Sequence, residues 1–296
     1  MRMSEQSAAP STSRPSCVRC RLAIPGLLWM GLFFLLPLVL VLAISFASRG
    51  TYGGILWEFT WANYLDLLHP LYGKIFAQSL WYAGLTTLLC LVLGFPLAYA
   101  IARSAPRWQP VWLLLVMLPL WTNFLARTYA WMILLRQDGL VNRWLSAIGF
   151  TDGPLELLYT PSAVVIGLVY GYLPFMVLPL YVAIERLDPL LVDAAWDLYA
   201  SRWAILIRVI LPLVKPGIVA GCILVFIPSI GAFITPDLLG GAKSMMIGNL
   251  IQHEYLVVRD WPLGSAVSFV LMGLVLLAVA LYYRNGPGEP GRREER

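Results

Sequence analysis

One arginine and several aromatic residues lie inside long apolar stretches of this 296-residue sequence. A charge in hydrocarbon costs about 2.5–3.5 kcal/mol on insertion scales, so Arg127 is by default a candidate functional residue. Aromatic rings and carboxylates are the groups that attract an organic cation. The candidates for a translocation path or gate are Trp121, Asn123, Arg127, Tyr129, Tyr170, Tyr172 and Asp237.

Each of these candidates has an ordinary alternative. Arg127 could line a path, extend toward the membrane surface, or form a structural pair with a neighbouring helix. The aromatic residues equally fit a belt at the membrane interface, and Asp237 equally fits the start of a turn.

Neither a metal site nor a catalytic site is predicted. Cys17 and Cys20 form a lone C-x-x-C on a polar tail, and a structural zinc site would need a second pair of ligands. The only histidines, His69 and His253, lack a convincing set of nucleophile, base and orienting groups. We therefore predict no enzyme activity and no cofactor for this chain.

The composition places these residues in a membrane protein. Hydrophobic residues make up 59% of the chain and charged residues 12%, about half the share of a typical soluble domain. A soluble enzyme and a disordered protein are both excluded. The net charge of +5 does not indicate nucleic acid, since in a membrane protein the placement of charges matters more than their sum.

The apolar stretches predict an all-α protein with six membrane-spanning helices, each near the 20 residues that a bilayer requires. The apolar core of the first, about 25 residues, is too long for a signal peptide. We expect a polar cytoplasmic tail over 1–21, a six-helix transmembrane domain over 22–284 and a second cytoplasmic tail over 285–296. The expected spans are 22–46, 79–101, 111–135, 162–184, 206–230 and 263–283.

The basic residues predict the orientation of these helices. With the N-terminus in the cytoplasm, 14 lysines and arginines fall in the inner segments and six in the outer ones. This bias follows the positive-inside rule and favours both ends in the cytoplasm. The outer face is then slightly acidic, which would attract cations but also follows from the bias itself.

A short amphipathic segment over 188–206 lies between the fourth and fifth expected spans. Asp188 followed by Pro189 is typical of a helix start, because the carboxylate can cap the first turn and proline suits it. The segment is too short to span the membrane. It could lie on the lipid surface as an interfacial helix or form a docking helix for a cytoplasmic partner.

The pattern of this segment resembles the EAA loop of permease subunits in binding-protein-dependent ABC importers. That loop begins with Glu-Ala-Ala, has a glycine four residues later, and ends on Leu-Pro. This sequence has aspartate in place of the glutamate and Tyr199 in place of the glycine. By this resemblance the residues that couple to an ATPase are Asp193, Ala194, Ala195, Tyr199, Ala200, Leu211 and Pro212.

Further segments over about 22–284 are similar to the permeases of spermidine and putrescine importers. They are 118–121 (LPLW), 127–131 (RTYAW), 139–142 (GLVN), 170–176 (YGYLPFM), 178–181 (LPLY), 225–228 (VFIP), 236–241 (PDLLGG) and 260–264 (DWPLG). The resemblance implies a type I importer permease fold and uptake of a small organic cation. It also implies three kinds of protein partner: cytoplasmic ABC ATPase subunits, a second permease chain of different sequence, and an external solute-binding protein.

The sequence itself supports the assignment of transport and ATP hydrolysis to separate subunits. It contains no G-x-x-x-x-G-K-[ST] phosphate loop, so ATP hydrolysis is expected on a separate subunit. Two alternatives stay open: an ABC permease for another small solute, and a secondary transporter. The second is disfavoured because the spans contain no mid-membrane acid and no internal repeat.

Overall fold

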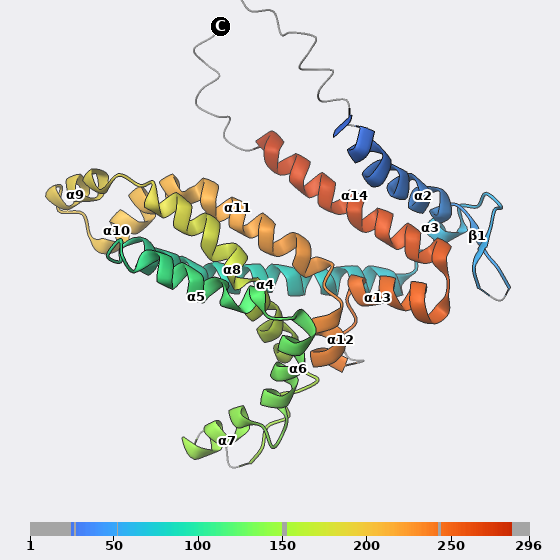
Figure 1. Cartoon of the computed structure of the whole chain (residues 1–296), viewed down its shortest axis with the longest axis horizontal. Coiled ribbons are helices and arrows are strands. Elements are labelled where there is room, and N and C mark those ends of the chain that lie inside the picture. The colour runs from blue at the N-terminus through green and yellow to red at the C-terminus, as the bar shows by residue number, and fades with distance from the viewer. Residues whose placement is uncertain (1–24, 27, 52, 150–152, 242–243, 286–296) are drawn as a thin grey trace, which may run out of the picture.

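The computed structural model describes residues 25–26, 28–51, 53–149, 153–241 and 244–285 (Figure 1). The Cys17–Cys20 pair, the tail over 1–21 and nearly all of the tail over 285–296 lie outside these residues. Within them the regular secondary structure is helical apart from one two-stranded hairpin, so the predicted all-α class is confirmed.

Five helices of the described chain are long and apolar enough to cross a membrane, and one bent pair can form a sixth span. The first comprises residues Leu28–Ser45, including the π-helical turn η1 (Gly31–Leu35) and α2 (Leu36–Ser45). The other four are α4 (Pro70–Ala102), α8 (Pro161–Glu185), the continuous run Arg202–Ile230, and α14 (Trp261–Asn285). The continuous run contains α10 (Arg202–Ile205), η2 (Leu206–Ile210) and α11 (Leu211–Ile230).

The shorter elements connect these helices. They are β1 (Ser48–Arg49), β2 (Ile55–Leu56), α3 (Ala62–Asp66), α5 (Gln109–Trp121), α6 (Phe124–Leu135), α7 (Leu140–Ala147), α9 (Pro189–Asp197), α12 (Ile234–Gly240), α13 (Ile247–His253) and η4 (Glu254–Val258).

Helices α4, α8 and α11 pack together as the central bundle, with fully buried side chains such as Met176, Val177 and Val214 between them. Helix α11 approaches α8 closely at Gly217 and Gly221. A methyl group at Gly217 would lie 2.8 Å from the Pro179 carbonyl oxygen, and one at Gly221 would lie 2.7 Å from the Met176 sulfur. These glycines allow the backbones to approach, as small residues do at membrane helix interfaces.

Helices α2 and α14 form a second pair that diverges from the central bundle, blue beside red in Figure 1. The hairpin of β1 and β2 follows α2 and holds the corner where η4 meets α14. The Arg49 side chain donates to the Val258 carbonyl over 2.9 Å, and the Gly54 amide donates to the Arg259 carbonyl over 3.2 Å.

The third expected span, 111–135, is divided into two helices. Helix α5 ends at Trp121, α6 begins at Phe124, and the helical segments on either side of this break are bent by 91°. Thr122 and Asn123 are extended, and the Asn123 side chain accepts from the amides of Leu125 and Ala126. A side chain that caps the start of a new helix competes with continuing the old one, and this explains the break.

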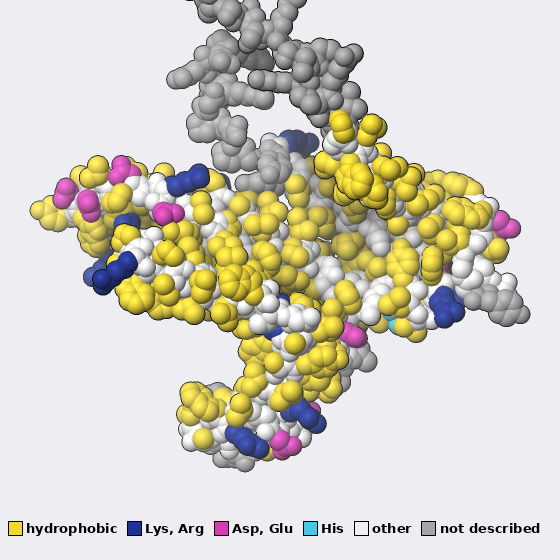
Figure 2. All heavy atoms as spheres, in the orientation of Figure 1, with side chains coloured by type: hydrophobic (Ala, Val, Ile, Leu, Met, Phe, Trp, Pro, Cys, Tyr) yellow, Lys and Arg dark blue, Asp and Glu magenta, His cyan; other side chains and the backbone are white. Residues whose placement is uncertain are grey.

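Side chains on the surface are distributed as expected for a membrane protein. Figure 2 shows hydrophobic side chains over most of the visible face, with charged groups gathered at the α9–α10 end and beside α7. Large apolar residues such as Trp81, Leu88 and Val92 on α4 are more than half exposed, which suits lipid or a partner chain.

Candidate functional site

Two of the apolar helical segments are interrupted, and each interruption is followed by a short helix. The first break separates α5 from α6, and the second, at residues 231–233, separates α11 from α12. Helix α6 packs against α12, so the two half-helices that follow the breaks adjoin each other (Figure 1). Non-helical backbone at membrane depth is tolerated only inside protein or along a water-filled cavity. This junction is therefore the candidate path.

Arg127 lies on the first turns of α6 and reaches back across the break. Its Nη1 donates to the Pro119 carbonyl oxygen over 2.6 Å. Its guanidinium carbon lies 5.2 Å from the centre of the Phe124 ring and 5.9 Å from that of Tyr170. Among the described residues, no carboxylate lies within ion-pair distance of Arg127. The cation is held by a backbone carbonyl and two aromatic faces.

The carbonyl oxygen of Pro119 accepts two hydrogen bonds because Pro119 lies in the last turn of α5. The last four carbonyls of a helix have no partner within it. The Thr122 hydroxyl donates to the Pro119 oxygen over 2.7 Å, in addition to the guanidinium of Arg127. The side chains at the break thus satisfy a carbonyl that the interruption leaves unpaired.

The predicted aromatic residues of α8 face both breaks. Tyr170 packs edge-to-face on Trp131 of α6, with ring centres 5.4 Å apart. The hydroxyl of Tyr172 donates to the Pro228 carbonyl over 3.2 Å, in the last turn of α11 before the second break. Helix α8 therefore connects the two interruptions.

The structure brings together only part of the set predicted from the sequence. Asn123, Arg127, Tyr170 and Tyr172 lie at or beside the breaks. Trp121, Tyr129 and Asp237 are exposed, and none of the three makes a side-chain hydrogen bond among the described residues.

The sequence reasoning did not identify Pro119, Phe124 or Trp131 as residues of the junction. Phe124 could have been found from its spacing, because residues three apart in a helix, such as Phe124 and Arg127, share a face. The role of Pro119 depends on the bend between α5 and α6, which the sequence pattern does not predict.

An apolar cavity of about 320 Å³ lies next to the Arg127 contacts. It is bounded by α4, α5 and α8, and Pro119 and Tyr170 belong both to this cavity and to the surroundings of Arg127. The other lining residues are Leu97, Ile101, Trp112, Leu115, Val116, Leu173 and Pro174.

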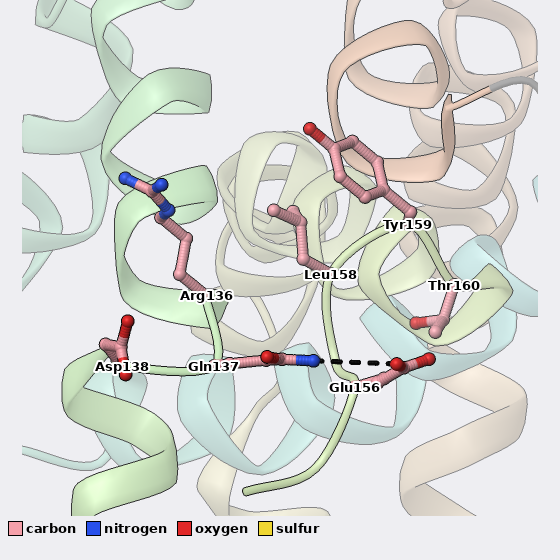
Figure 3. Close-up of a pocket in the computed structure, with 7 residues that line it drawn as sticks. All are labelled: Arg136, Gln137, Asp138, Glu156, Leu158, Tyr159 and Thr160. Carbon is pink, nitrogen blue, oxygen red and sulfur yellow. Dashed lines mark hydrogen bonds between the residues drawn. The ribbon is translucent and has the colours of Figure 1, made fainter.

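A second cavity, polar and about 360 Å³, lies beyond the end of α6 (Figure 3). Arg136, Gln137 and Asp138 follow α6, and residues 156–160 precede α8. Figure 3 shows the Gln137 amide directed at Glu156, to which it donates over 3.5 Å. None of the residues predicted for the path lines this cavity.

The segment over 188–206 forms two short helices at one end of the molecule (Figure 1). The Asp188 side chain caps α9 by accepting from the Leu190 amide over 3.0 Å, as the sequence predicted. Tyr199 adopts a left-handed conformation with φ of 56° and is 99% exposed. The bend that a glycine would make easily is thus made by a tyrosine.

The exposed side of this loop is apolar as well as acidic. Leu190, Trp196, Leu198 and Trp203 are all about half exposed or more, and Asp193 and Ala194 are exposed beside them. Ala195 and Ala200 instead pack against the core of the bundle. The loop therefore exposes apolar and acidic side chains, while Ala195 and Ala200 attach it to the bundle.

Comparison with known proteins finds close relatives, although no family model matches the chain. It is 46% identical over 256 residues to the "Spermidine/putrescine transport system permease protein PotB" of Haemophilus influenzae, covering 86% of this chain and 90% of that protein. The Escherichia coli protein of the same name is 46% identical over 259 residues, covering 86% and 93%. The E. coli "Inner membrane ABC transporter permease protein YdcU" is 31% identical over 278 residues, covering 90% and 88%.

Solved structures show a similar fold. A chain of a bacterial ABC transporter involved in the import of alginate matches with a TM-score of 0.70 and 18% identity, covering 91% of this chain and 96% of that one. A chain of a bacterial alginate ABC transporter in complex with an alginate pentasaccharide-bound periplasmic protein matches with a TM-score of 0.69 and 19% identity, covering 90% and 94%.

Proposed function

The chain belongs to the family of spermidine/putrescine transport permeases, and from this premise we propose that it is the membrane permease subunit of an ATP-driven polyamine importer. The observation that carries the proposal is the 46% identity to PotB over nearly the whole of both chains. The importer fold and the apolar helices support a multi-pass protein of the bacterial inner membrane.

This role requires partners. ATP is hydrolysed by separate ATPase subunits, which dock on α9 and α10 in the cytoplasm. A second permease of different sequence completes the path, and an external binding protein delivers the polyamine. Both ends of the chain lie in the cytoplasm, in accord with the positive-inside bias, while the hairpin and α7 lie outside.

The continuous run Arg202–Ile230 supplies the mechanical link in this proposal. Its first residues belong to the docking loop, and its last turn adjoins the break before α12. Because a packed helix moves as a unit, a displacement of the loop on ATP binding is carried to the break. The break then opens or closes the path between α6, α8 and α12.

Replacement of Asp193 by arginine tests the docking assignment. We expect Asp193→Arg to leave the protein in the membrane but to uncouple ATP hydrolysis from polyamine uptake, because it reverses an exposed charge on α9. The matched control is Asp193→Glu, which keeps the charge and should keep uptake. Both quantities are measured on the complete complex in proteoliposomes. Uptake by Asp193→Arg equal to that of the control would contradict the assignment.

A further inference from the structure

The surroundings of Arg127 have the composition of a binding site for an organic cation. Two aromatic faces lie within 6 Å of the guanidinium carbon, those of Phe124 and Tyr170. Aromatic faces attract cations through the ring quadrupole. The Pro119 carbonyl accepts over 2.6 Å, at the C-terminal end of α5 where the helix dipole is negative.

The Pro119 carbonyl and the rings of Phe124 and Tyr170 form a cage around the guanidinium, and the apolar cavity beside this cage offers a surface on which an alkyl chain can pack. It shares Pro119 and Tyr170 with the cage, and it is otherwise lined mainly by apolar side chains such as Leu97, Ile101 and Leu173. A polyamine consists of ammonium groups joined by short methylene chains. One ammonium could contact the carbonyl and rings while the adjoining methylenes lie in the cavity.

Because the groups that hold Arg127 are uncharged, an ammonium group can replace its guanidinium without breaking an ion pair. Arg127 is held by a carbonyl and two rings, and no described carboxylate pairs with it. If an ammonium takes the place of the guanidinium, the charge in the cage stays the same. Displacement of Arg127 from a carboxylate would instead separate an ion pair and leave one charge without its partner.

We propose that Pro119, Phe124 and Tyr170 form an alkylammonium subsite, which Arg127 occupies as a tethered competitor until an ammonium group of the substrate displaces it. The inference rests on the proposed function, because it names where that substrate is held. Arg127 then keeps the subsite from small cations when no polyamine is present.

The direct test is equilibrium binding of radiolabelled putrescine to the complete permease–ATPase complex in nanodiscs, without binding protein or ATP. Arg127→Ala should bind putrescine about tenfold more tightly than the unchanged chain, because the competitor is gone. In the Arg127→Ala background, Tyr170→Leu should remove the gain and Tyr170→Phe should keep it. Uncharged 1,4-butanediol should not compete. No gain in Arg127→Ala, or a gain that survives Tyr170→Leu, would overturn the subsite.

A second measurement guards against misfolding of Arg127→Ala. With Arg127 unchanged, Tyr170→Leu should slow ATP-driven putrescine uptake about fivefold relative to Tyr170→Phe at equal amounts of assembled complex, because only the leucine variant lacks the aromatic face. Equal uptake by these two variants would refute the subsite. If the unchanged complex takes up putrescine but none of these differences is found, only the subsite fails. If the unchanged complex takes up no polyamine, the proposed function fails with it.

Discussion

At the scale of single residues, Tyr199 shows how a departure from the family pattern is accommodated. The sequence places tyrosine where the EAA loop has glycine, and the structure keeps the left-handed bend nonetheless. A non-glycine residue in this conformation costs about 1–2 kcal/mol. The side chain is almost fully exposed, so no packing within the described chain offsets that cost.

Substitution of Tyr199 tests this interpretation. Tyr199→Gly should leave the free energy of unfolding within about 1 kcal/mol of its original value, because relief of strain offsets the greater entropy of the unfolded chain. Tyr199→Val should lower it by about 1–2 kcal/mol, since a β-branched residue is poorly tolerated at positive φ. Thermal unfolding of the purified complex measures both. Equal stability of the two variants would show that the bend is not strained.

Glu254 is a buried carboxyl at the corner between η4 and α14. Glu254 is 8% exposed, and its Oε1 lies 3.8 Å from His253 Nδ1. Asp260 lies six residues further along the chain, and its Oδ2 is 3.8 Å from Arg49 Nη1. Burial raises the pKa of Glu254 above 4.5, and the Asp260 charge raises it further, although His253 and Arg49 oppose this. The native state thus binds this proton more tightly than the unfolded chain does.

The sign of the pH dependence follows from linkage. Because the native pKa is raised, Glu254 favours the folded state least once it is ionised, and stability falls as pH rises from about 4.5 through the native pKa. Glu254→Gln should therefore raise the melting temperature more at pH 8 than at pH 5. The exposed Glu58→Gln serves as the control and should show no such difference. A pH-independent effect of Glu254→Gln would contradict this account.

At the scale of helices, long apolar segments and a single cap could be predicted from the sequence. Asp188 and Pro189 begin α9 as expected, and the apolar runs become long helices. The break in 111–135 could not be predicted, because the segments on both sides of it are apolar and read as one continuous span. It depends on the Asn123 cap and on a contact from Arg127 to Pro119 that exists only after the bend.

The close approach of α8 and α11 gives a prediction at the same scale. Gly217→Val should destabilise the protein by about 1–3 kcal/mol, because its side chain would overlap Ala183 and the Pro179 carbonyl. The matched control is Gly273→Val in α14, where a methyl group meets no atom within 4 Å. Thermal unfolding in detergent compares them. Similar melting temperatures for both variants would mean that the two helices are not tightly packed at Gly217.

At the scale of the whole molecule, one continuous helical run joins the 188–206 segment to the second break. Hydropathy predicts that such a helix crosses the membrane, but not that α12, which follows its far end, packs against α6. The contacts between helices at the candidate path could not be predicted from hydropathy either. The sequence identified Arg127 and Tyr170 separately, whereas their meeting depends on how α6 packs against α8.

The central claim is that this chain is the permease of an ATP-driven polyamine importer. It is tested most directly by uptake of radiolabelled putrescine and spermidine in cells with and without this chain, in the presence of its partner subunits. The assay is repeated after ATP is depleted while the proton gradient is kept. We expect uptake that requires both the chain and ATP. Uptake that persists without ATP, or that does not depend on the chain, would contradict the claim.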